Sequence, residues 1–95
     1  MKLNYALATT LLLTFFFAGH SPLAEQSGEE LFLQNCAECH QEDGQGISNV
    51  YPALAGNELV LGSGVDVALV LIIGRGEMPS FVGAMSSTEM AKVVN

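Results

Sequence analysis

The chain has 95 residues, of which 49% are hydrophobic and 14% charged, so it holds one small domain at most and is not an intrinsically disordered acidic chain. Ten Asp and Glu residues against three Lys and Arg give a net charge of −7, which argues against a nucleic-acid-binding protein. The length also excludes most enzyme folds, including the (β/α)8 barrel and a complete dinucleotide-binding domain.

Residues 1–24 predict a secretory signal peptide. Lys2 is the only charged residue before Glu25, and residues 6–18 are apolar except for three threonines. This stretch is shorter than the about 20 apolar residues that a membrane span needs. We expect cleavage after Ala24, with Pro22 standing where a small residue is preferred; an uncleaved N-terminal anchor is the alternative. Export would place the mature chain in the periplasm, with no stable membrane insertion.

Residues 25–95 are the predicted domain. It keeps all ten carboxylates and two of the three fixed cations, Arg75 and Lys92, which leaves a net charge of −8. Its single histidine is His40. A domain of about 70 residues commonly relies on a disulfide, a metal or another covalent staple. The cysteines Cys36 and Cys39 are the candidates for such a staple.

The first helix is predicted from about residue 28 to 38, because Ser27 followed three positions later by Glu30 is a capping-box pattern. The sequence then reads Cys36-Ala37-Glu38-Cys39-His40, with the two cysteines on one face of a helical turn. A disulfide between cysteines this close stabilises little. A thioredoxin-like redox pair requires a preceding strand, which the flanking sequence lacks.

Two metal-based interpretations of this motif remain. A structural zinc site needs four ligands, and the motif supplies three. Covalent attachment of a c-type haem uses all three residues: Cys36 and Cys39 each add a thiol to a vinyl group, and His40 is the proximal ligand of the iron. Export agrees with the haem interpretation, since c-type haem is attached outside the cytoplasm. The zinc and dithiol interpretations stay as alternatives.

The middle of the chain predicts a loop and two helices. Residues 41–49 are polar and glycine-rich, which is typical of a loop, and a short helix is expected within 54–61. The seven consecutive apolar residues 67–73 also suit a buried strand. Ser63 with Asp66 three positions later, and a glycine stop at 74, favour a helix over 63–74 instead. A helix that is apolar all round needs cover on both sides, and haem would cover one.

A second axial ligand is sought among three methionines, because the domain has no other histidine. Met78 stands in the glycine- and proline-containing segment 74–81, an irregular loop that can present a thioether to iron. Met85 and Met90 lie just before and inside the last predicted helix, where methionine usually packs in a core. Met78 is therefore the predicted sixth ligand.

The last helix is predicted over 86–95, where Ser86 and Glu89 form a second capping-box pattern. About nine residues is short for a stable helix. We expect the C-terminus to be truncated, with an incomplete last helix and a weakened crossing of the two terminal helices.

The domain resembles class I cytochromes c of the small bacterial periplasmic monohaem type. The resemblance covers residues 27–95 and is carried by Gly28, Leu31-Phe32, Cys36-Ala37-Glu38-Cys39-His40, Asp43-Gly44-Gln45-Gly46, Tyr51-Pro52-Ala53-Leu54-Ala55-Gly56-Asn57, Gly74 and Met78-Pro79-Ser80-Phe81. It implies an all-α fold of three to five helices around one covalent haem, with His40 and Met78 as axial ligands. It also places Pro52 at the proline whose carbonyl accepts a hydrogen bond from the proximal histidine.

The function expected from this resemblance is periplasmic one-electron transfer with His/Met ligation. The protein is not expected to be an enzyme, because iron filled on both axial faces has no vacancy for substrate. The alternative is a haem-based module that binds or senses a small gas at an open sixth site. Arg75 is expected either to pair with a haem propionate or to be a solvated loop charge. The expected apolar wall of the haem comprises Leu54, Leu69, Ile72, Ile73, Phe81 and Val82.

The partners expected for this domain are redox proteins, either a dehydrogenase donor or a terminal oxidase acceptor. Its acidic surface would steer it toward basic docking sites.

Overall fold

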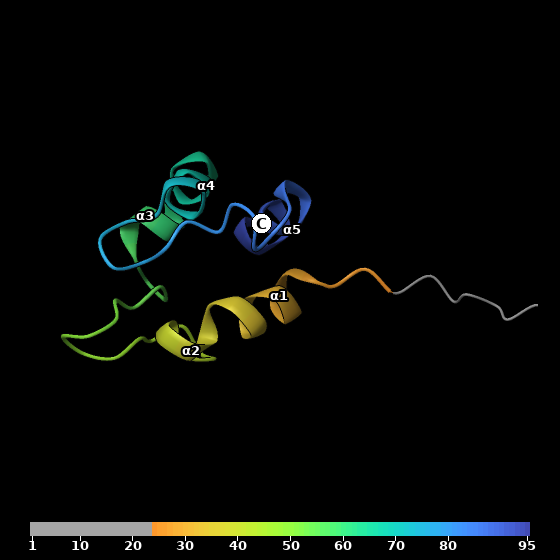
Figure 1. Ribbon diagram of the computed structural model, residues 1–95. Helices are drawn as coiled ribbons and strands as arrows, with labels where there is room; N and C mark the ends of the chain where they lie inside the picture. Colours follow the sequence, from red (N-terminus) through yellow and green to blue (C-terminus); the bar gives the residue numbers. More distant parts are fainter. Residues whose placement is uncertain (1–23) are drawn as a thin grey trace, which may run out of the picture.

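The computed structural model describes residues 24–95, so the predicted signal peptide lies outside the described residues except for Ala24. Within 24–95 the chain forms helices and isolated bridges but no named strand (Figure 1). The helices are α1 (Gly28–Asn35), α2 (Ala37–His40), α3 (Glu58–Leu61), α4 (Gly64–Ile73) and α5 (Ser87–Val94). The expected all-α fold is confirmed. None of these helices is long and apolar enough to cross a membrane.

The first predicted helix is two helices in the structure. Cys36 has φ −122° and ψ −34°, outside regular helical geometry, and it separates α1 from α2. Its N–H still bonds the Phe32 carbonyl at 2.8 Å, and its own carbonyl accepts from the His40 N–H at 2.9 Å. The break therefore turns the chain without leaving the backbone of Cys36 unpaired.

The two central helices are set by polar caps at their first turns. Asn57 begins α3 by accepting the Leu59 N–H at 2.9 Å, so the helix expected within 54–61 is confined to its second half. Ser63 begins α4 by accepting the Val65 N–H at 3.2 Å. Gly74, with φ 81°, ends α4. The apolar run 67–73 is thus helical, as the cap and the glycine stop predict.

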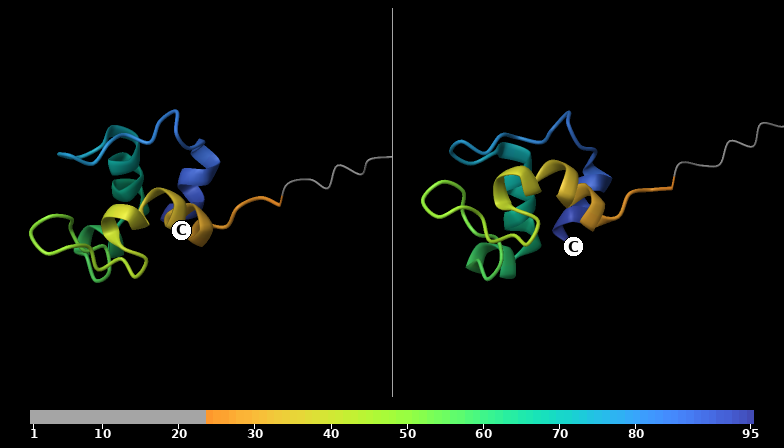
Figure 2. Two further views of the ribbon diagram at one scale, coloured as in Figure 1. Left: turned by 60° about the horizontal axis from the view of Figure 1, so that its bottom comes forward. Right: turned by 90° about the horizontal axis from the view of Figure 1, so that it is seen from below.

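The helices form two groups. In Figure 1, α1 and α2 lie along one side of the molecule, and α3, α4 and α5 lie on the other; Figure 2 views the fold from the side of α1 and α2. Helix α5 packs against both α1 and α4, and α3 packs against α4. The buried core lies where α1, α4 and α5 meet. It comprises Leu31, Leu71, Met85 and Met90, with Met78, Phe81, Val93 and Val94 packed at its edge.

The two terminal helices cross at a glycine. A Cβ placed on Gly28 would collide with the carbonyl oxygen of Lys92 and come within 3.0 Å of its carbon. The backbones of α1 and α5 can approach this closely only because residue 28 has no side chain. The two terminal helices therefore cross in direct backbone contact at Gly28.

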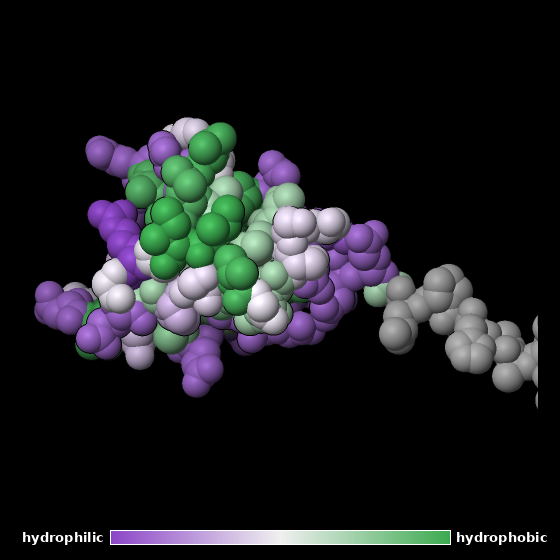
Figure 3. Space-filling view, turned by 45° about the horizontal axis from the view of Figure 1, so that its top comes forward, coloured by the Kyte–Doolittle hydropathy of each residue, from purple (hydrophilic) through white to green (hydrophobic). Residues whose placement is uncertain are grey.

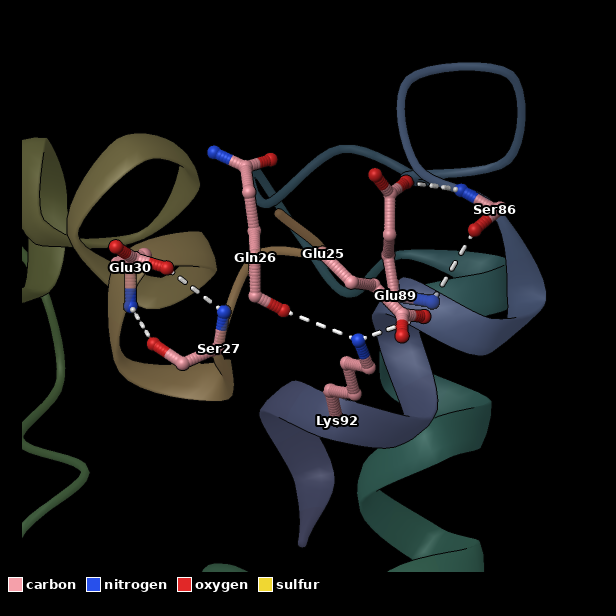
Figure 4. A network of polar contacts seen from close by, with 7 residues as sticks. All are labelled: Glu25, Gln26, Ser27, Glu30, Ser86, Glu89 and Lys92. Carbon is pink, nitrogen blue, oxygen red and sulfur yellow. Dashed lines mark hydrogen bonds and ion pairs between the residues drawn. The ribbon is translucent and has the colours of Figure 1, made fainter. Parts of the chain in front are cut away.

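A polar network surrounds this crossing (Figure 4). The Lys92 ammonium lies 2.8 Å from the Glu25 carboxylate and donates to the Gln26 carbonyl at 3.1 Å. Both expected capping boxes are present, one between Ser27 and Glu30 and the other between Ser86 and Glu89. The Glu25 side chain is 75% exposed, so the ion pair contributes little, on the order of 1 kcal/mol or less.

Replacing Gly28 with Ala tests the crossing. The new methyl group would push α1 away from the Lys92 carbonyl, and we expect the free energy of unfolding to fall by about 1–3 kcal/mol. Gly64→Ala is the matched control, because a Cβ there meets only the end of the Val94 side chain, at 3.3 Å. Denaturant unfolding of both holoprotein variants makes the comparison. Equal stability of Gly28→Ala and the parent would contradict the close crossing.

Candidate functional site

The Cys-His motif lies on the turn that joins α1 to α2. Cys36 is buried and Cys39 half-buried, and both are free thiols. The Cys39 and His40 N–H groups both bond the Cys36 carbonyl, at 3.2 and 2.9 Å. The sequence spacing is therefore realised as one tight turn that carries two thiols and an imidazole.

His40 is only 7% exposed, and its ring is fixed by one hydrogen bond. Its Nδ1 lies 2.8 Å from the Pro52 carbonyl oxygen. A carbonyl oxygen only accepts, so Nδ1 carries the proton in this contact, and Nε2 of the neutral ring keeps a lone pair. Within residues 24–95, Nε2 makes no hydrogen bond. The contact expected between His40 and Pro52 is present.

The 41–55 loop is folded so that the Pro52 carbonyl reaches His40. The Gly46 N–H bonds the His40 carbonyl at 2.8 Å, and Ile47 and Tyr51 exchange two backbone bonds of 2.9 and 2.8 Å. Gly46 has φ 64°, and a Cβ there would collide with the Tyr51 carbonyl and lie 2.7 Å from the Pro52 carbonyl. The glycine-rich sequence of residues 41–49 predicts a loop, but it does not predict this contact of Gly46 with Pro52.

The Cys36 thiol sits in an environment that favours its neutral form. Burial raises the pKa of the Cys36 thiol, and the neighbouring Cys39 adds to the effect. The neighbouring Cys39 raises the pKa of the Tyr51 phenol. Tyr51 therefore lies beside the motif. This agrees with its position directly before Pro52, whose carbonyl contacts His40.

Met78 lies on the loop between α4 and α5, which is bound to the C-terminal end of α4. The Phe81 N–H donates to the Leu71 carbonyl at 2.8 Å, and the Ser80 hydroxyl donates to the Ile72 carbonyl at 2.5 Å. These bonds satisfy carbonyls that the helix end leaves unpaired. Arg75 and Met78 exchange two backbone bonds of 3.0 Å, which closes a tight turn. Met78 itself is half-buried at the edge of the core.

The other two methionines are core residues. Met85 is 6% exposed and Met90 9%, and both belong to the cluster around Leu31 and Leu71. This agrees with the packing role expected for them. Arg75 is exposed and forms no salt bridge within residues 24–95, so its pairing with a propionate stays a prediction.

Three of the six residues expected to form an apolar haem wall lie on the far side of α4 from the buried Leu71. Leu69, Ile72 and Ile73 are exposed there, and Val82 is exposed on the loop. Leu54 and Phe81 are half-buried. Residues 67, 70 and 71, spaced as i, i+3 and i+4, form the inner face of α4 instead.

Among the described residues, no group of three or more His, Cys, Asp and Glu is placed to hold a metal ion. The family model for cytochrome c oxidase, cbb3-type, subunit III matches residues 23–95. The chain belongs to this cytochrome c family. The cytochrome carries one covalent c-type haem as its prosthetic group.

Known proteins similar to this cytochrome agree with the family match. It is 35% identical over 82 residues to the cytochrome c subunit of an alcohol dehydrogenase (quinone) from Gluconobacter oxydans, covering 73% of this chain and 17% of that protein. It is 38% identical over 67 residues to cytochrome c-552 of Thermus thermophilus, covering 68% and 45%. The chain therefore spans less than half of either relative. Cytochrome c6 of Phaeodactylum tricornutum has a similar structure, with a TM-score of 0.58 and 30% identity, covering 70% of this chain and 82% of that one.

The residues present fit such a haem. Two unpaired thiols stand one turn apart beside a buried imidazole whose Nε2 keeps its lone pair. The described part of the chain buries only a small apolar core of its own, so several apolar side chains outside it remain available to a prosthetic group.

Replacing Gly46 with Ala tests how the imidazole is held. The new Cβ would displace the Pro52 carbonyl from His40, so the NMR signal of the Nδ1 proton should shift. Gly56→Ala is the matched control, because Gly56 has a similar φ of 72° but a Cβ there meets nothing within 4 Å.

In both variants an alanine would occupy the left-handed backbone region, which should lower the free energy of unfolding by about 1–2 kcal/mol. In Gly46→Ala the collision of the new Cβ with the Tyr51 carbonyl should lower it by about 1–3 kcal/mol more. An unshifted His40 signal in Gly46→Ala would show that the glycine does not control the contact.

Proposed function

We propose that this cytochrome is a periplasmic one-electron carrier in which Cys36 and Cys39 hold the haem and His40 and Met78 are its axial ligands. The observation that carries the proposal is the 2.8 Å contact between His40 Nδ1 and the Pro52 carbonyl, on the same turn as two free thiols. When bound, the haem supplies an iron that alternates between Fe(III) and Fe(II) and so moves one electron at a time.

The role proposed for His40 follows from its hydrogen bond. The Pro52 carbonyl holds the proton on Nδ1 and fixes the plane of the ring. An acceptor on Nδ1 also pushes electron density into the ring, so Nε2 becomes a stronger donor to a metal. Burial of His40 keeps water from competing for that nitrogen.

The thioether role proposed for Cys36 and Cys39 rests on their spacing and their free state. Each thiol would add its S–H across one vinyl group, so no atom leaves. Two covalent bonds beside His40 would hold the macrocycle in register with the imidazole. They would also supply the staple that a domain with so small a core requires.

Met78 is proposed as the sixth ligand because the other methionines of residues 24–95 are committed to the core. Its loop is fixed at two α4 carbonyls, and its side chain is half-buried rather than enclosed. A soft thioether favours Fe(II), so His/Met ligation would give a higher potential than two histidines.

The proposed partners are a dehydrogenase that donates electrons or a terminal oxidase that accepts them. One relative is the cytochrome c subunit of an alcohol dehydrogenase (quinone), and the matching family is a subunit of cbb3-type oxidase. Periplasmic location rests on the signal peptide predicted for residues 1–24. The surplus of carboxylates over fixed cations would steer the carrier toward basic docking sites.

Met78→Ala tests the ligand assignment. Loss of the thioether should lower the midpoint potential by at least about 60 mV, a tenfold change in a one-electron equilibrium. It should also create carbon monoxide binding in the reduced protein. Redox titration and absorption spectra make both measurements.

Met90→Leu is the control, since it exchanges residues of similar volume in the core and should cost less than about 1.5 kcal/mol with no change in potential. A parent protein that already binds carbon monoxide would favour the gas-binding alternative. An unchanged potential in Met78→Ala would reject Met78 as the ligand.

A further inference from the structure

The outer face of α4 is an exposed aliphatic stripe that continues onto α3. Val65, Leu69, Ile72 and Ile73 are spaced as i, i+4, i+7 and i+8, which places them on one side of the helix. Leu61, the last residue of α3, is also exposed, four residues before Val65, and is counted with the stripe. The side chains of Leu61, Val65 and Ile73 are 73%, 68% and 71% exposed. Single exposed aliphatic residues are common on protein surfaces, but several gathered on one face indicate an interaction site. Figure 3, seen from the side of the molecule on which α4 lies in Figure 1, shows hydrophobic side chains gathered on this face.

This stripe faces away from the residues of the proposed haem site. Leu71, on the opposite side of α4, is buried against α1 and α5. The Met78 loop is hydrogen-bonded at the C-terminal end of α4, and α2, which carries His40, lies on the other side of the fold (Figures 1 and 2). The stripe is therefore left uncovered by the rest of residues 24–95.

The charges around the stripe indicate what kind of surface would cover it. No charged side chain lies within the stripe, but Glu58 and Asp66 are exposed at its α3 end, Glu58 one turn before Leu61. The cation near it, Arg75, lies just past its other end. Residues 25–95 carry ten carboxylates against two fixed cations. A covering surface has to be apolar in the middle and basic at the edge that meets Glu58 and Asp66.

A second copy of this chain suits the stripe poorly. Both copies would carry the same large negative charge. Helix α4 has ten residues and is about 15 Å long, so a pair of these helices offers far less than the roughly 800 Å² per partner of a standard interface. Transient redox complexes, in contrast, form with interfaces below about 1,200 Å² in total.

We propose that the stripe Leu61, Val65, Leu69, Ile72 and Ile73 is the docking surface for a redox partner protein whose contact is apolar and edged with Lys or Arg at the α3 end. The proposal rests on the electron-carrier function. Docking here would anchor the partner and leave the side of the cytochrome that carries α2 uncovered.

The probe is a synthetic amphipathic helix with leucine on one face and lysine on the other, titrated into isotopically labelled holoprotein at 0.15 M salt. Methyl NMR signals of Leu69 and Ile72 should shift, and those of the exposed Leu33 and Val50, which lie off the stripe, should not. A leucine/glutamate peptide of the same length should bind at least tenfold more weakly. Equal shifts at Leu33 and Val50 would overturn the proposal, as would equal binding of the two peptides.

Variants test which residues form the surface. Leu69→Gln should weaken peptide binding at least fivefold, and Leu33→Gln, at a similarly half-exposed leucine on α1, should not change it. Ile73→Gln repeats the test if Leu69→Gln is poorly folded. An unchanged affinity in a folded stripe variant would overturn the proposal.

Two further outcomes would assign the stripe to another role. Stripe signals that shift with protein concentration in the absence of peptide would identify a second copy as the occupant. A changed haem spectrum or potential in Leu69→Gln would make the face part of the haem wall. The carrier function is judged separately, because Met78→Ala tests it without touching the stripe.

Discussion

The site depends on one hydrogen bond, from His40 Nδ1 to the Pro52 carbonyl. A buried imidazole without a partner is costly, and in this fold its partner comes from a loop that has no regular structure of its own. The loop is held by backbone bonds, including those from the Leu54 and Ala55 N–H groups to the Gly44 carbonyl at 2.7 and 3.0 Å. Gly46 then allows the Pro52 carbonyl to lie against the turn after α2.

The two proposed axial ligands are held by different means. His40 is fixed by the 41–55 loop, outside the core, whereas the Met78 loop is fixed by the C-terminal carbonyls of α4 and lies at the edge of the core. That core joins α1, α4 and α5 and includes the crossing at Gly28. A change that destabilises the packing of the terminal helices should therefore disturb Met78 more than His40. The stability of the holoprotein and the strength of the sixth ligand are coupled through α4.

The sequence was most informative where local chemistry decides the structure. The capping boxes at Ser27 and Ser86, the glycine stop at 74 and the helix within 63–74 could all be predicted, because a cap or a stop acts over one turn. The break at Cys36 could not, since Cys36 has no helix-breaking side chain and no glycine or proline stands beside it. The inner and outer faces of α4 could not be told apart either, because every residue from 67 to 73 is apolar and only the position of α5 selects Leu71 for the core.

The covalent haem and its His40/Met78 ligation are best tested by the absorption spectrum of the protein matured with the haem-attachment machinery, recorded in both oxidation states. We expect covalently held haem that is low-spin in both states, with the weak iron–sulfur charge-transfer band of His/Met ligation in the oxidised form. A high-spin spectrum would contradict the assignment of Met78 and leave the sixth position open. Absence of covalent haem would contradict the role of Cys36 and Cys39 and restore the zinc and dithiol interpretations of the motif.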